Sequence, residues 1–333
     1  MTEGNLPQIL RFFNFIELPL LHLQKVIHLS AMEKLQKPQN TPPFLNPNDT
    51  ILLCGSARFT TTKVIAIFEQ FCRENNWVPE VDLTILKAHH QFAGSDEERT
   101  EAVQKALKRD DIKAIIFARG GYGTIRIMDK LELQELQDHP KWLIGFSDLT
   151  YLLNPLAKTN ACIHGPMALQ LQDHPKSTEL LSQFLKGEKS SWSCATQAQD
   201  WSLDEAQWIG GNLSIIYAML ATPFFHIPEN AVLFLEDLDE YLYHIDRMMA
   251  SLYHGGVLHK VKAVMAGSFS DMRDHDIPFG LDASEILNYW CGKAGVLVIE
   301  NLPFGHEKTN SPIIMGKSSQ IKIKNHEFSV NWE

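Results

Sequence analysis

The chain has 333 residues, of which 44% are hydrophobic and 21% charged, and this length is enough for two domains with real cores. Its formal net charge of −10 argues against a nucleic-acid partner, which would need a basic face. The five cysteines form no CxxC pair, so we expect a reducing cytoplasm and neither a disulfide framework nor a metal site.

Residues 1–41 differ in composition from the rest of the chain. The apolar stretch 8–29 is interrupted by charges and a proline. The uncharged segments between these interruptions are too short for a signal peptide or a membrane span. We expect a poorly ordered extension or a loosely docked amphipathic helix. A proline- and asparagine-rich linker at 36–49 then leads into the first domain.

Strands and helices alternate through the first half of the chain. Strands are predicted at 50–54, 81–86, 112–118 and 142–146, and helices at 62–74, 95–109, 124–131 and 149–158. At the start of the second predicted helix, Ser95 and Glu98 have the spacing of a capping box. Glycine or small polar residues follow the strands, which is typical of a doubly wound parallel sheet. We therefore predict an N-terminal α/β domain over 42–167, with its ligand beyond the carboxyl ends of the strands.

The second half of the chain has a different pattern. Residues 168–208 are polar, and we interpret them as a connecting segment without a clear strand. A smaller, mixed α+β domain is predicted over 209–333. Its elements are expected to be a helix at 213–220, strands at 231–235, 261–265 and 295–299, and a hairpin at 320–330.

Three polar side chains follow predicted strands and could face one another. Ser147 stands at an abrupt corner between a strand and a helix, Glu236 ends a run of apolar residues, and His306 follows a proline turn. Ser, His and Glu together would form a hydrolytic triad. Each also has a non-catalytic alternative: Ser147 could be a helix N-cap, Glu236 a solvated acid and His306 a surface histidine. The glycine turn 120–123 could likewise bend the chain or hold a phosphate, so the residues alone indicate only a two-domain α/β protein with a site between domains.

Several longer motifs occur in one order along the chain. They are Arg119-Gly-Gly-Tyr-Gly123, Ile144-Gly-Phe-Ser-Asp148, His164-Gly-Pro-Met167, Gly210-Gly-Asn-Leu-Ser214, Phe234-Leu-Glu-Asp237, Ile245-Asp-Arg-Met248 and Pro303-Phe-Gly-His306. Together they resemble the LD-carboxypeptidase family of serine peptidases, which also contains the microcin C immunity peptidases. The resemblance covers about residues 42–320. Met32 lies shortly before this region, so a start of translation there is one expectation.

The resemblance implies a role for each residue of the triad. Ser147 would be the nucleophile, His306 the general base and then acid, and Glu236 the carboxylate that orients the histidine. The backbone N–H groups of Gly121 and Asp148 would form the oxyanion hole. No cofactor or metal is implied, and the site would lie between the two domains.

The sequence departs from the family pattern at several places. Residues 239–243 read Asp-Glu-Tyr-Leu-Tyr where the family usually has Gly-Glu-x-Pro-Tyr, and Ser268 stands where an aspartate is common. The first strand ends in Cys-Gly-Ser instead of Ala-Pro-Ser. None of these positions belongs to the implied triad.

The function implied is that of a cytoplasmic, homodimeric serine carboxypeptidase that releases D-Ala from murein tetrapeptides during cell-wall recycling, with no membrane partner. Alternatives are a microcin-immunity-type peptidase that cleaves an aminoacyl-nucleotide conjugate, a non-catalytic binding protein on the same scaffold, and nucleotide binding at the glycine turn. A carboxypeptidase must bind the substrate's terminal carboxylate. We expect donors at a helix N-terminus near Thr124, with Arg247 a second candidate whose more natural partner is Asp246.

Overall fold

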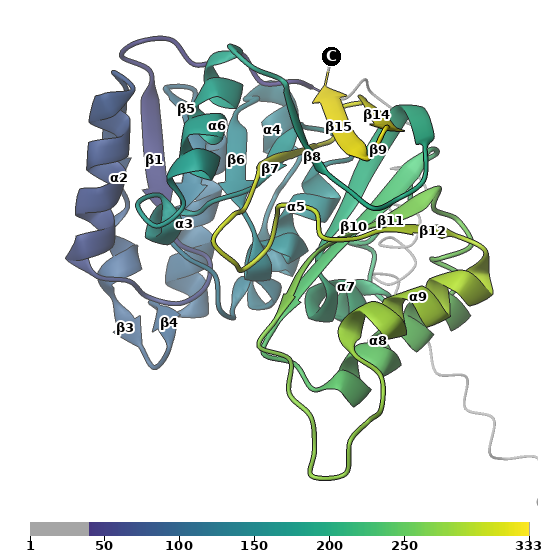
Figure 1. Cartoon of the computed structure of the whole chain (residues 1–333). Helices are drawn as coiled ribbons and strands as arrows, with labels where there is room; N and C mark the ends of the chain where they lie inside the picture. The colour runs from purple at the N-terminus through teal and green to yellow at the C-terminus, as the bar shows by residue number, and fades with distance from the viewer. Residues whose placement is uncertain (1–39, 333) are drawn as a thin grey trace, which may run out of the picture. The chain divides into compact units, whose positions relative to one another are not determined.

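The computed structural model describes residues 40–332, shown in colour in Figure 1. The extension predicted over 1–41 therefore lies outside the described residues, except for its last two positions. None of the described helices is both long enough and apolar enough to span a membrane.

The first sheet has six strands in the order β13-β7-β6-β5-β1-β2. Their bounds are β1 Thr50–Cys54, β2 Val78–Val81, β5 Ile112–Phe117, β6 Trp142–Gly145, β7 Cys162–His164 and β13 Ile313–Met315. The five strands from β2 to β7 run parallel, and β13 joins β7 antiparallel. The strand order reverses at β1, which lies between β2 and β5. The predicted doubly wound parallel sheet is thus confirmed, with its switch point at the carboxyl ends of β1 and β5.

Helices connect these parallel strands. They are α2 Thr62–Glu74, α3 Asp96–Lys108, α4 Glu135–Asp138 and α5 Thr150–Leu156. Because parallel crossovers are right-handed, α2 lies on one face of the sheet and α3, α4 and α5 on the other. The predicted capping box at the start of α3 is confirmed: the Glu98 N–H donates to Ser95 Oγ at 3.2 Å, and the Ser95 N–H donates to Glu98 Oε2 at 2.8 Å.

The second sheet has seven strands in the order β12-β11-β10-β9-β14-β15-β8. Their bounds are β8 Ser191–Ala195, β9 Trp201–Asn212, β10 Ala231–Leu238, β11 Ala263–Ser270, β12 Leu297–Ile299, β14 Ser319–Lys324 and β15 Glu327–Trp332. Strands β9 to β12 run parallel, whereas β14, β15 and β8 pair antiparallel. This mixed sheet confirms the predicted α+β character of the second half, including the terminal hairpin.

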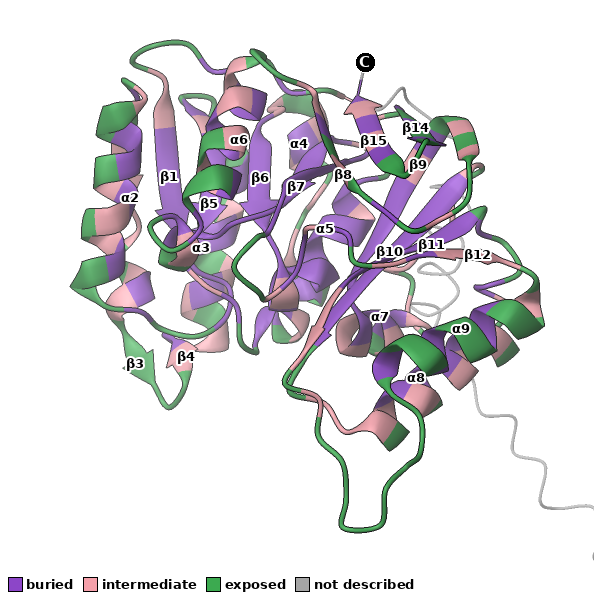
Figure 2. Cartoon of the chain, in the orientation of Figure 1, coloured by how far each residue is buried: buried purple, intermediate pink, exposed green. Residues whose placement is uncertain are grey.

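Three helices connect the parallel strands of the second sheet. They are α7 Leu213–Met219, α8 Leu242–His254 and α9 Ala283–Ala294. The strand order advances in one direction only, so right-handed crossovers place all three on one face. Figure 1 shows them grouped beside β10–β12. In Figure 2 the central strands β1, β5, β6 and β10 are buried over most of their length, while α8 and α9 each keep one exposed face.

The expectation that 168–208 contains no strand is wrong. This segment holds helix α6, Pro175–Lys186, then β8 and the start of β9. Both strands are polar on their exposed side, and their partners β15 and β14 lie more than a hundred residues further along the chain. Local periodicity does not report such distant pairing.

Two predictions in the first half also need correction. The second strand is β2, which ends at Val81, and residues Leu83–Leu86 form a 3-10 turn instead. The turn begins because the Asp82 carboxylate accepts the Thr84 N–H at 2.8 Å. The helix predicted at 124–131 is two short 3-10 turns, Thr124–Arg126 and Met128–Lys130.

Helix α5 holds the two sheets together. The Asn154 side chain donates to the Gly210 carbonyl at 2.9 Å and accepts the Gly210 N–H at 3.1 Å. Thr150 Oγ1 accepts the Asn212 N–H at 3.1 Å. Strand β9 is therefore fixed, by buried hydrogen bonds, to the helix that follows Ser147.

Candidate active site

Ser147 stands directly after β6, at the point where the chain turns into α5. Its φ is 61°, a left-handed conformation that is unusual for a residue with a β-carbon. Phe146 before it is extended, and a 3-10 turn, Ser147–Leu149, leads into the helix. Such a corner projects the serine hydroxyl beyond the end of the sheet and is the kind of local strain that occurs at functional sites.

Glu236 and His306 come from the second sheet. Glu236 lies on β10, where it is fully buried and opposite Asn212 of β9. His306 follows β12 in a turn that is fixed by two hydrogen bonds. The His306 N–H donates to Ser268 Oγ at 3.0 Å, and the N–H of the preceding Gly305 donates to Asn310 Oδ1 at 3.1 Å.

The structure brings the three predicted triad residues together. His306 Nε2 lies 3.2 Å from Ser147 Oγ, and His306 Nδ1 lies 2.5 Å from Glu236 Oε2. The ring of Phe146 packs against the imidazole at a centroid distance of 4.8 Å. One segment that follows a strand of the first sheet and two segments of the second sheet thus supply a single hydrogen-bonded chain.

The environment of His306 favours a basic imidazole. Burial lowers its pKa, but the charge of Glu236 and the hydrogen bond to that carboxylate outweigh burial, so the pKa is raised above its usual value. A carboxylate at Nδ1 holds the proton on that nitrogen. Nε2 is then free to accept the hydroxyl proton of Ser147.

The glycine turn after β5 passes close to the nucleophile. A β-carbon at position 120 would lie 3.3 Å from Ser147 Oγ and 3.4 Å from the Asp148 nitrogen, so only glycine leaves this space open. The next residue, Gly121, has φ of 114°. The two backbone N–H groups predicted as the oxyanion hole, those of Gly121 and Asp148, therefore belong to segments in contact beside the hydroxyl.

The Asp148 side chain fixes the glycine turn to the nucleophile loop. It is buried, and its Oδ2 accepts the Thr124 N–H at 2.9 Å. Burial raises its pKa, and the hydrogen bonds from Thr124 partly oppose that rise. Thr124 Oγ1 in turn bonds Ser56 Oγ at 2.8 Å. The sequence predicted only the backbone role of Asp148; the Ser-Asp pair at a strand end was the signal for its side chain.

The helix N-terminus expected near Thr124 and the ion pair expected between Arg247 and Asp246 both need correction. The Thr124 N–H already donates to Asp148, and the 3-10 turn that starts there is too short to act as a helix N-terminus. Arg247 makes no ion pair with Asp246. Instead, Asp246 Oδ1 accepts from Trp290 Nε1 at 2.8 Å, and the Arg247 guanidinium lies 5.1 Å from the centre of the Tyr243 ring.

Two other ionisable side chains, Asp237 and His164, are buried near the triad. Burial, and then the neighbouring Glu236 charge, raise the pKa of Asp237 to about 7, and its carboxylate accepts from Asn212 Nδ2 and the Ser214 N–H, each at 2.9 Å. Burial lowers the pKa of His164 to about 3, and its ring packs edge-on against Phe234 at 4.9 Å. Neither side chain touches Ser147.

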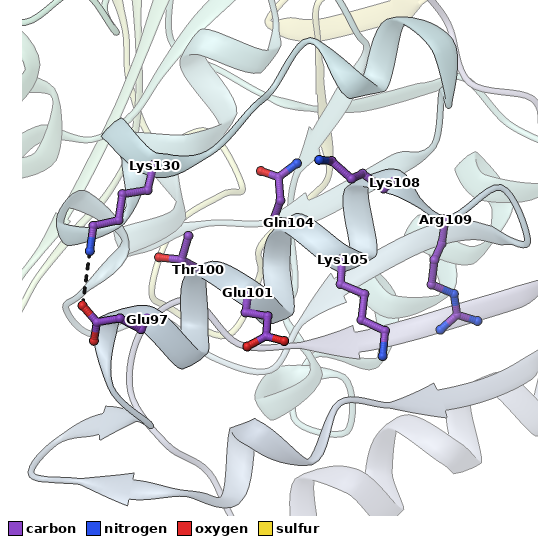
Figure 3. A pocket seen from close by; sticks show the side chains of 8 residues that line it. All are labelled: Glu97, Thr100, Glu101, Gln104, Lys105, Lys108, Arg109 and Lys130. Carbon is purple, nitrogen blue, oxygen red and sulfur yellow. Dashed lines mark hydrogen bonds and ion pairs between the residues drawn. The ribbon is translucent and has the colours of Figure 1, made fainter.

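A hollow elsewhere on the surface does not compete with this site. It runs along the exposed side of α3 and is lined mainly by charged side chains, among them Glu97 and Lys130, which form an ion pair at 3.4 Å (Figure 3). Its lining includes no serine, cysteine or histidine and none of the triad residues. Within residues 40–332, no cluster of three or more histidine, cysteine or acidic side chains is placed to hold a metal ion.

Comparison with known families agrees with this arrangement. The model of the LD-carboxypeptidase N-terminal domain matches residues 51–165, and that of the C-terminal domain matches residues 205–321. The chain belongs to the LD-carboxypeptidase family. Each matched region carries part of the triad: Ser147 lies in the first, Glu236 and His306 in the second.

Similar proteins include a probable murein peptide carboxypeptidase of Bacillus subtilis. It is 28% identical over 290 residues, which cover 84% of this chain and 91% of the relative. Among solved structures, the muramoyltetrapeptide carboxypeptidase of Oxalobacter formigenes has a TM-score of 0.77 at 23% identity and covers 85% of this chain and 98% of its own. MccF in complex with glutamyl sulfamoyl guanosine has a TM-score of 0.75 at 18% identity, with 89% and 99% covered. At these identities the two structures establish the shared fold alone.

Proposed function

We propose that this LD-carboxypeptidase family member is a serine-type enzyme that hydrolyses the L,D peptide bond before a terminal D-alanine in murein tetrapeptides. The observation that carries the proposal is the hydrogen-bonded chain from Ser147 through His306 to Glu236. In the cell we expect it to act as a cytoplasmic homodimer in cell-wall recycling. The name of the Bacillus subtilis relative supports a murein peptide as the substrate class.

The geometry suggests how the reaction would proceed. Ser147 Oγ attacks the carbonyl carbon of the scissile bond while His306 Nε2 takes the hydroxyl proton. The negative charge on the carbonyl oxygen is stabilised by the N–H groups of Gly121 and Asp148. His306 then passes the proton to the leaving amine of D-Ala. A water molecule, deprotonated by the same imidazole, hydrolyses the ester and restores the serine.

Mass spectrometry of a muropeptide mixture tests the proposal. After incubation with the protein, the tetrapeptide L-Ala-γ-D-Glu-meso-diaminopimelate-D-Ala should lose one D-Ala, with little action on the pentapeptide. Folded Ser147→Ala should leave the mixture unchanged. Loss of D-Ala with both proteins would rule out the serine mechanism. An intact tetrapeptide together with cleavage of an aminoacyl sulfamoyl nucleoside would favour the microcin-immunity type of activity instead.

A further inference from the structure

Two arginines flank the glycine turn beside the nucleophile. Arg119 immediately precedes Gly120 in the chain. Arg58, from the loop after β1, lays its side-chain stem against Gly121: a β-carbon at position 121 would lie 2.5 Å from Arg58 Cδ and 2.8 Å from its Cγ. Both guanidinium groups are therefore carried by segments that border the proposed oxyanion donors.

Neither arginine has an acidic partner among the described residues. Arg58 Nε donates to the neutral Gln91 side chain at 2.9 Å, and the buried Nε of Arg119 has no hydrogen-bond partner. Burial lowers the pKa of Arg119, and the nearby positive charge of Arg58 lowers it further, so the two cations repel each other.

Two other arginines near the glycine turn do have an acidic partner. Arg99 and Arg126 both form ion pairs with Asp96, which compensates their charge. The chain has a net charge of −10, yet Arg58 and Arg119 lie near each other without an acidic partner among the described residues. An uncompensated, partly buried guanidinium is costly unless an anion binds to it.

The chemistry of a carboxypeptidase places an anion at this position. In its substrate the terminal carboxylate carbon is only three bonds from the scissile carbonyl carbon, hence less than about 4 Å away. A carbonyl oxygen bound at the Gly121 N–H therefore brings the carboxylate next to the segments that carry both guanidinium groups. A guanidinium matches a carboxylate with two parallel hydrogen bonds.

We propose that Arg58 and Arg119 form the subsite that binds the terminal carboxylate of the substrate. The inference rests on the proposed function, and it replaces the helix N-terminus expected at Thr124. It assigns the preference for a free C-terminus to two side chains outside the triad.

The test compares kcat/KM for the murein tetrapeptide and for its C-terminal amide in the wild type, Arg58→Gln and Arg119→Gln. Both substrates contain the same scissile bond, so their ratio cancels general damage to catalysis. In the wild type the acid should be preferred by about 10- to 150-fold, the worth of a charge-assisted hydrogen bond. Each variant should reduce that preference by about tenfold or more. The matched control Arg73→Gln removes one charge on the outer side of α2, where Arg73 pairs with Glu69, and should keep the wild-type ratio.

The outcomes separate this inference from the proposed function. Turnover of the tetrapeptide with the wild-type ratio retained in Arg58→Gln would overturn the subsite and leave the function standing. The exposed position of Arg58 makes that variant decisive even if Arg119→Gln does not fold. If the wild type cleaved neither substrate and Ser147→Ala did not bind the tetrapeptide in calorimetry, the proposed function would fail and the subsite with it.

Discussion

The two halves of the candidate site are held in place by different means. On the nucleophile side, backbone geometry sets the position: Ser147 has φ of 61°, Gly120 leaves room beside the hydroxyl, and Asp148 holds the turn through the Thr124 N–H. On the base side a buried charge does so. Glu236 is fully buried, and within the described residues its Oε1 has no hydrogen-bond partner, so His306 is the one group that its carboxylate contacts through a hydrogen bond.

The two sides of the site should therefore respond differently to substitutions and to changes of pH. The N–H groups of Gly121 and Asp148 do not titrate, so an added methyl group should harm the nucleophile side more than a change of pH that leaves the Asp148 carboxylate ionised. The base side should depend strongly on the charge of Glu236 as well as on close packing, since a β-carbon at Gly305 would clash with Ser268 Oγ. Substitutions on each side therefore test this difference.

The largest effect is expected where the two halves meet. Ser147→Ala, His306→Ala and Glu236→Ala should each reduce kcat by about 10⁴-fold or more, because the three side chains act as a unit. For the same reason a double substitution should cost little more than a single one. Steady-state kinetics on folded variants, checked by melting temperature, would measure this. Additive losses would contradict a hydrogen-bonded triad.

Removal of the charge alone probes the base side. Glu236→Gln should reduce kcat/KM by about 10²–10⁴-fold, since the orienting carboxylate is lost. Activity requires neutral His306, whose pKa Glu236 raises, so wild-type activity should fall as the pH drops through that raised pKa. In Glu236→Gln the cause of the rise is gone, and the acid limb of the pH profile should move to lower pH. An unmoved acid limb would show that another group titrates.

An added methyl group probes the nucleophile side. Gly120→Ala would place a β-carbon 3.2 Å from Ser147 Cβ and 3.4 Å from the Asp148 nitrogen. We expect a loss of about 10²–10³-fold in kcat, comparable to the loss of an oxyanion-hole donor, with the shape of the pH profile unchanged. Gly292→Ala is the matched control, because a β-carbon there meets nothing within 4 Å. Equal activities of the two variants would refute the close approach.

The smallest effect is expected at the turn that carries the base. Ser268→Ala removes the acceptor of the His306 N–H, a neutral hydrogen bond worth about 0.5–1.5 kcal/mol, so kcat/KM should fall by only about three- to tenfold. Ser268→Thr keeps the hydroxyl and should retain more activity. Kinetics of the two variants side by side would decide whether the hydroxyl or only the volume at this position matters.

The sequence predicted the parts of the molecule whose cause is local. Strand β1, helix α2 and the Ser95–Glu98 capping box follow from residues a few positions apart, and so does the corner at Ser147. The meeting of Ser147, Glu236 and His306 was a hypothesis from strand ends, supported by a family resemblance.

The features that were missed depend on contacts between distant residues. Strand β13 has three residues and pairs with β7, about 150 positions earlier, so no periodicity reveals it. The Asp148 carboxylate takes the Thr124 N–H, and the chain there forms 3-10 turns where a helix was expected. Arg58 reaches the site only because the loop after β1 folds against the glycine turn.

Identification of the residue that a fluorophosphonate modifies tests the central claim most directly. A serine nucleophile displaces fluoride and becomes phosphonylated on its oxygen, which adds a fixed mass to one peptide. We predict that, after digestion, this mass is found on Ser147, that Ser147→Ala is not labelled, and that His306→Ala is labelled much more slowly. Stoichiometric labelling of another residue, or none in a protein that releases D-Ala from the tetrapeptide, would contradict the assignment of Ser147 as the nucleophile.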